Sequence, residues 1–217
     1  MKLKESGPIS FSCSPKLEAA FSEQPDKYAT HEMQSGLRDS LVAALVTAGV
    51  STLGDYLWAN VLEHHRPMYG LVHGALLFMT VGFCLGVAAR KPLSGAIAGA
   101  LIGFSAAAGF YVLQPFIGYS ALFVLFVALW LALGLLNGRV LQKRDSLRTV
   151  AARSVLAAAG SGLGFYAISG IWFPFHPRGW DYARHFISWT IAYFPGFAAL
   201  LVKQRHVQPA DVALRQP

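Results

Sequence analysis

Long apolar runs follow one another along this chain, with only short polar turns between them. Six of these runs are each close to 20 residues in length, and they cover residues 39–62, 68–89, 93–117, 118–137, 149–171 and 183–203. A helix of about 20 apolar residues is long enough to cross the hydrocarbon core of a bilayer. A backbone in lipid must also satisfy its own hydrogen bonds, which favours helices. The pattern therefore predicts an all-α protein, a bundle of six transmembrane helices.

The composition favours the same class of protein. Hydrophobic residues make up 54% of the chain and charged residues only 13%, whereas soluble domains carry about 25% charged residues. The net charge of +7 could suggest a nucleic-acid partner. The positions of the basic residues explain this charge better, so we expect no nucleic-acid binding.

Basic residues alternate between the connections of the predicted helices. Lys and Arg gather before residue 39, at Arg90 and Lys91, between residues 139 and 153, and after residue 202. The intervening connections hold few. Six spans with a positive cytoplasmic side require this alternation, so both termini are predicted to be cytoplasmic.

The domain organisation follows from these runs. Residues 1–37 are polar and are expected to be a disordered cytoplasmic tail, residues 38–204 form the six-helix domain, and residues 205–217 are a short cytoplasmic tail. Residues 16–24 could instead form a short amphipathic helix on the membrane surface.

Small residues recur at four-residue spacing within several predicted helices. Such residues let helix backbones approach closely, either within one bundle, which we favour, or across a dimer seam. Pro195 is followed by Gly196 and should kink the sixth helix, which would open a lipid-facing cleft. The residues predicted to line or hinge this cleft are Gly99, Gly103, Gly164, Pro195 and Gly196.

Ionisable residues gather at the end of the bundle that is predicted to face outward. Asp55 and His73 lie within the depth of the outer leaflet, and Arg184 opens the sixth helix. An ionisable residue inside a membrane is costly, and it is therefore a candidate functional group. Asp55 could also simply pair with Arg184 or His73, and His73 could form a hydrogen bond between helices.

Catalytic motifs are missing from the chain. The histidines His64, His65, His73 and His176 could bind a metal if the protein were an enzyme, but they show no zinc-binding spacing. We therefore predict no metal and no cofactor. No charged residue lies between Lys91 and Arg139, which argues against a solute path through this part of the bundle.

One local pattern resembles the Insig (insulin-induced gene) family, although the Asp–Arg and Arg–Trp spacings differ from those of the family by a few residues. The matching residues are Tyr166, Gly170, Trp172, Pro177, Asp181, Arg184 and Trp189. The resemblance implies a non-enzymatic protein that binds a glycerolipid, such as diacylglycerol, in a cavity between helices. It also implies oligomers. Because the family has bacterial members, it favours a bacterial inner membrane.

Our leading prediction is a membrane protein that binds a glycerolipid or isoprenoid-like lipid without catalysis. The third, fifth and sixth helices would provide apolar walls, with a few polar groups orienting the ligand. Asp55, His73 and Arg184 would contact its headgroup. A lipid-modifying enzyme with its site at the outer face is the first alternative. A small transporter or an assembly factor is the second.

Overall fold

The computed structural model describes residues 15–61, 66–142, 146–172 and 177–202. Within these ranges the chain forms α-helices and one π-helical segment, so the predicted all-α class is confirmed. The elements are α1 (Pro15–Asn60), α2 (Arg66–Ala88), α3 (Pro92–Ile117), α4 (Ser120–Leu135), η1 (Leu136–Gln142), α5 (Leu147–Trp172) and α6 (Asp181–Leu201).

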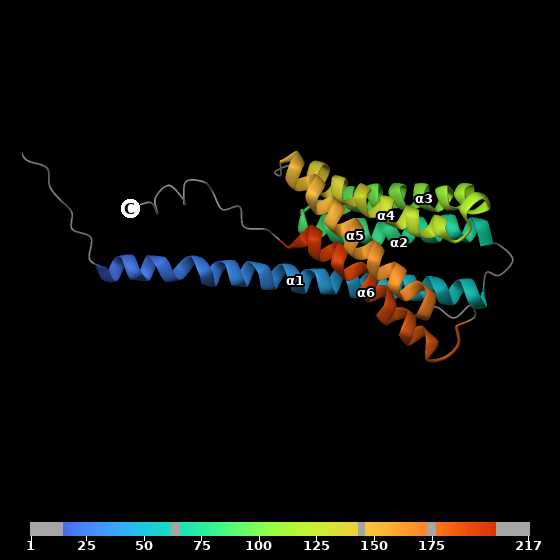
Figure 1. Ribbon diagram of the computed structural model, residues 1–217, viewed down its shortest axis with the longest axis horizontal. Helices are drawn as coiled ribbons and strands as arrows, with labels where there is room; N and C mark the ends of the chain where they lie inside the picture. The colour runs from blue at the N-terminus through green and yellow to red at the C-terminus, as the bar shows by residue number, and fades with distance from the viewer. Residues whose placement is uncertain (1–14, 62–65, 143–145, 173–176, 203–217) are drawn as a thin grey trace, which may run out of the picture.

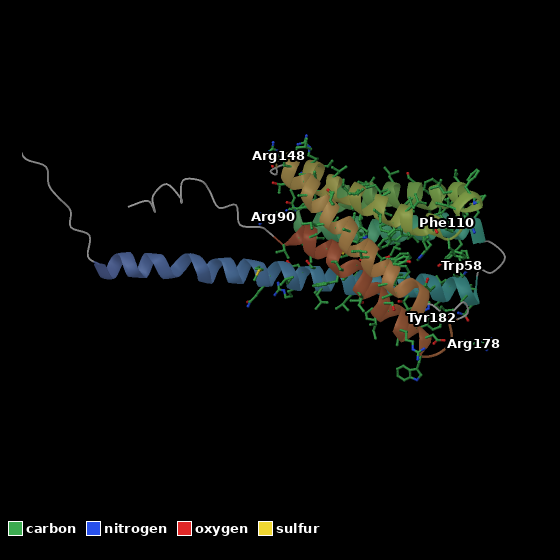
Figure 2. All side chains as sticks on the ribbon, viewed as in Figure 1. Trp58, Arg90, Phe110, Arg148, Arg178 and Tyr182 are labelled. Atoms are coloured by element: carbon green, nitrogen blue, oxygen red, sulfur yellow. The ribbon has the colours of Figure 1, made fainter. Side chains whose placement is uncertain are left out.

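The helices run alternately in opposite directions between two ends of one bundle (Figure 1). We call one end the basic end. It contains the turn from α2 to α3, the end of η1 with the start of α5, and the end of α6. The other end, where α1 stops and α2 and α6 begin, is called the aromatic end. Figure 2 shows Arg90 and Arg148 at the basic end, and Trp58, Tyr182 and Arg178 at the aromatic end.

The bundle is built as a chain of neighbouring helices. α1 packs mainly on α6, which packs on α5, and the order continues through α4 and α3 to α2, whereas α1 makes a smaller contact with α2. The interior includes Val81 and Leu85 of α2 together with Trp130, Tyr193 and Phe197, all fully buried. Close van der Waals packing of this kind holds helices together in lipid, where the hydrophobic effect between helices is weak.

Glycines bring the backbones of α2 and α3 into direct contact. A Cβ atom at Gly82 would collide with the backbone of Gly95 and Gly99, and one at Gly103 would collide with the carbonyl of Gly74. Only glycine permits this approach. The interpretation of these small residues as packing within one bundle is therefore confirmed for α2 and α3.

Four helical segments among the described residues are long and apolar enough to cross a membrane. They are Met33–Asn60, Met68–Ala88, Pro92–Ile117 and Ser120–Gln142. The structure therefore supports a multi-pass membrane protein.

The N-terminal segment differs from the coil that the sequence suggested. The described part of residues 1–37 is helical, because α1 begins at Pro15 and continues without a break to Asn60. Residues 16–24 are rich in Leu, Glu, Ala and Lys, which are good helix formers. The part of α1 with membrane-spanning character begins only at Met33.

At the basic end, side-chain donors satisfy the last carbonyls of two helices. Arg153 of α5 donates to the carbonyls of Ala199, Leu200 and Val202. Asn137 of η1 adds a bond of 3.2 Å to the carbonyl of Leu200. These carbonyls lack partners within α6, since the last turn of a helix has no following residues to bond.

Lys91 acts in the same way on the neighbouring helix end. Its Nζ donates to the carbonyl oxygens of Leu141 at 2.7 Å and Val140 at 3.2 Å. A cation is favourable at this position because the C-terminal end of a helix carries partial negative charge. Basic residues therefore complete helix ends here.

Candidate functional site at the aromatic end

Asp55 of α1 is bonded by two side chains of α6. The Nδ1 atom of His185 lies 2.9 Å from Asp55 Oδ2, and the Nε1 atom of Trp189 donates to the same oxygen at 2.8 Å. The two donors are four residues apart, so they stand on the same face of α6. They fix one carboxylate oxygen and thereby the orientation of the carboxylate.

A second polar contact lies one helical turn deeper in the bundle. The hydroxyl groups of Ser51 and Tyr193 are 3.1 Å apart, and both side chains are fully buried. Ser51 precedes Asp55 by four residues, just as Trp189 precedes Tyr193, so the two contacts form one seam between α1 and α6. The Tyr193 ring also stacks on Trp189 at a centroid distance of 5.5 Å, which supports the indole that bonds Asp55.

α2 approaches this seam with two stacked rings. His73 lies against Gly54, where a Cβ atom would overlap its imidazole. The ring of Tyr69 stacks on His73 at 5.5 Å and 15°, and its hydroxyl donates to the Gly54 carbonyl. The absence of a side chain at Gly54 therefore brings His73 against α1 at the residue that precedes Asp55.

The carboxylate is accessible from outside the bundle. The Asp55 side chain is 26% exposed, compared with 5% for the His185 side chain below it. Asp55 precedes the end of α1 at Asn60 by five residues, which places it about 8 Å inside that end. A group at this depth can meet the headgroup region of a membrane lipid.

Arg184 does not join Asp55, contrary to the prediction that the two residues act together. Its guanidinium lies 3.7 Å from Asp181, three residues earlier on α6, and its side chain is 62% exposed. The carboxylate of Asp181 also accepts a bond from the backbone N–H of Arg178. Of the three predicted headgroup residues, Asp55 and His73 come together and Arg184 belongs to a separate local pair.

The residues predicted to hinge a cleft are instead packed against other helices. α6 continues through Pro195, which faces Gly160 of α5. A Cβ atom at Gly196 would overlap Trp130 and Ser161, and one at Gly164 would lie near the backbone of α6. Gly99 and Gly103 face the backbone of α2, as described above. The absent side chains allow close approach, so these positions form interfaces rather than an opening.

An apolar groove of about 390 Å³ lies elsewhere, between α3 and α4. Small residues on both helices leave this space, which is lined by Leu101, Ile102, Ser105, Ala106, Leu125, Ala128, Leu129 and Ala132. This groove differs from the predicted cleft, whose walls were the third, fifth and sixth helices, because α4 rather than α5 or α6 faces α3 here.

Of the four histidines considered as metal ligands, the structure describes only His73. His64, His65 and His176 lie outside the described residues. Within the described ranges, no group of three or more His, Cys, Asp or Glu side chains could hold a metal ion.

Sequence reasoning missed the two residues that bond Asp55. Trp189 entered only through the family pattern, and His185 was not singled out as a site residue. The signal was nevertheless present. Ser51 and Asp55 on α1, and His185, Trp189 and Tyr193 on α6, recur at four-residue spacing. Polar residues on one face of each of two apolar helices indicate that these faces meet.

No protein-family model, curated protein or solved structure matches this chain. Function must therefore be argued from the site itself.

Proposed function

We propose that this chain is a membrane protein with six spans that binds a lipid at the aromatic end without catalysis. α5 and α6 have 26 and 21 residues, and a helix of about 20 residues covers the hydrocarbon core. They lie in the same bundle as the four apolar helices (Figure 1). The concentration of Arg and Lys at one end supports a cytoplasmic basic end, and thus cytoplasmic termini.

The observation that carries the lipid proposal is the accessible carboxylate of Asp55. The side chain lies inside a membrane-length helix, is held by His185 and Trp189, and remains 26% exposed beside His73. An ionisable group is expensive at such a position. His185 and Trp189 offset part of this cost, and a lipid headgroup at outer-leaflet depth would contact the part of the carboxylate that stays exposed, while the apolar surface of the helices suits its acyl chains.

The pattern of residues that resembles the Insig family agrees with this proposal, since that family binds lipid without catalysis. In this chain Asp181 and Arg184 pair at the start of α6, and Trp189 bonds Asp55. Membership of that family, assembly into homo-oligomers and location in a bacterial inner membrane belong to the proposal.

Mass spectrometry of the protein purified in mild detergent tests the lipid proposal directly. One lipid class retained near one molecule per chain is the expected result, and Asp55→Ala or His73→Ala should lower its amount. Arg184→Ala serves as the matched control, because Arg184 pairs with Asp181 on its own helix. A lipid profile equal to that of the bulk membrane in the wild-type protein would refute the proposal.

An enzyme that acts on lipid at the same site is the second candidate. The hydrogen bond between Asp55 and His185 is the type of pairing that general acid–base catalysis uses. Incubation with lipid extract and analysis of the products separates the two candidates. Turnover that disappears in Asp55→Asn would favour the enzyme, whereas retention of unchanged lipid would favour binding.

A further inference from the structure

We infer that the lipid recognised at Asp55 carries an ammonium group in its headgroup, as ethanolamine and choline phospholipids do. This inference rests on the lipid-binding proposal and names the headgroup that the site selects. Two observations carry it, namely the accessible carboxylate and the aromatic rings at the same end of the bundle.

The carboxylate has capacity for a further partner. His185 and Trp189 both bond Oδ2, and a carboxylate offers two oxygens with about four acceptor positions. As far as the described residues are concerned, Oδ1 and the exposed part of the side chain can therefore accept a bond from a ligand. The nearby guanidinium of Arg184 is engaged by Asp181, so it does not provide the positive charge.

Aromatic rings from three helices lie at the same end of the bundle as this carboxylate. Trp58 of α1 lies 5.5 Å from Tyr69 of α2, which in turn stacks on His73. Tyr56 of α1 meets Tyr182 of α6 edge to face at 5.5 Å. Trp58 is 37% exposed and Tyr56 is 46% exposed, and Figure 2 shows Trp58 and Tyr182 at this end of the bundle.

Aromatic rings beside a carboxylate are suited to an ammonium ion. The faces of Trp and Tyr rings carry negative potential and attract quaternary or primary ammonium groups, while the carboxylate supplies the opposite charge. The same arrangement disfavours anionic headgroups, since a phosphate monoester or a glycerol phosphate would bring like charge to Asp55. A headgroup with only a hydroxyl group could donate a hydrogen bond to the carboxylate but would gain no attraction to the ring faces.

A competition between lipids with identical acyl chains tests this inference. The purified protein is equilibrated in mixed micelles that contain equal amounts of phosphatidylethanolamine, phosphatidylglycerol and diacylglycerol, and the retained lipids are quantified by mass spectrometry. We expect about tenfold enrichment of phosphatidylethanolamine in the wild-type protein. Asp55→Asn should reduce this enrichment to near parity, and the exposed Trp58→Leu should reduce it in part.

The outcomes separate the inference from the function on which it rests. Equal retention of the three lipids, or enrichment of phosphatidylglycerol or diacylglycerol, overturns the ammonium assignment but leaves lipid binding intact. Retention of no lipid overturns both. Excess soluble choline is added as a further arm: it should displace retained phosphatidylethanolamine if the site binds an ammonium group, and the absence of any displacement would count against such a site. Arg184→Gln should match the wild type throughout.

Discussion

The two ends of α6 are held in opposite ways. At the basic end Arg153, which is only 8% exposed, donates to backbone carbonyls that α6 itself leaves unpaired. At the aromatic end the donors belong to α6, and they converge on the side-chain carboxylate of Asp55, which is 26% exposed. A charge that completes a helix end has a structural reason to be there. Asp55 completes no helix end; it joins α1 to α6 and keeps part of its side chain exposed, and the proposed binding role rests on that exposed part.

Removal of the Arg153 side chain should give the largest loss of stability. Arg153→Leu leaves the carbonyls of Ala199 and Val202 without this donor, at a cost of about 3 kcal/mol for bonds to a charged group in a buried setting. Thermal unfolding in detergent measures the effect. Arg148→Gln, an exposed arginine on the same helix, is the control and should be close to neutral. Equal effects of the two variants would contradict a capping role.

Asp55→Asn should have a small effect on stability and a large effect on lipid binding, the opposite of Arg153→Leu. Asparagine keeps an oxygen that can accept from His185 and Trp189, so we expect a stability loss of only about 1 kcal/mol. Lipid retention, however, should fall well below that of Arg153→Leu protein that remains folded. Thermal unfolding and lipid mass spectrometry on the same samples give both values. A folded Asp55→Asn protein with wild-type lipid content would show that Asp55, like Arg153, has only a structural role.

Lys91→Met should have a smaller effect that is confined to the basic end. Its ammonium group bonds the carbonyls of Val140 and Leu141, and a cation at a helix C-terminus contributes up to about 1 kcal/mol. Thermal unfolding should therefore shift by a few degrees at most, while the retained lipid should be unchanged. Arg90→Gln, an exposed neighbour, provides the comparison. A change in lipid content caused by Lys91→Met would contradict this expectation, because it would show that the basic end influences lipid binding at the aromatic end.

Tyr193→Phe is expected to give the smallest effect. The substitution removes only the hydroxyl that bonds Ser51 and keeps the ring that stacks on Trp189. Hydrogen bonds between membrane helices contribute about 0.6 kcal/mol on average. A double-mutant cycle with Ser51→Ala measures this energy, and the double variant should be no less stable than either single variant alone. Strictly additive effects would show that the two hydroxyls do not interact.

The helices could be predicted from the sequence because lipid demands long, continuous apolar segments. The turn between α2 and α3 illustrates this: Arg90 and Lys91 end one apolar run and Pro92 begins the next, and the observed helices end and begin there. The start of α1 was harder to predict, because its N-terminal part is polar and shows no hydrophobic periodicity from which a helix could be recognised.

The partners of Asp55 could not be predicted in the same way. Each residue along a helix turns the side-chain direction by about 100°, so the apolar pattern alone does not define which helix Asp55 faces. At Pro195 the sequence suggested a kink that opens space, but the neighbouring Gly196 and Gly160 allow Trp130 and α5 to fill it. Whether space opens at Pro195 depends on residues of other helices, and the sequence around Pro195 does not contain this information.

The pairing of α1 with α6 has a consequence for biogenesis. α1 emerges from the ribosome before its main partner, α6, and 130 residues separate Asp55 from His185. At 5–20 residues per second this is a delay of roughly 7 to 26 seconds. During that interval Asp55 is inserted without the donors of α6. A chain truncated before α6 would therefore keep this carboxylate without its His185 and Trp189 partners, and would be a natural substrate for membrane quality control.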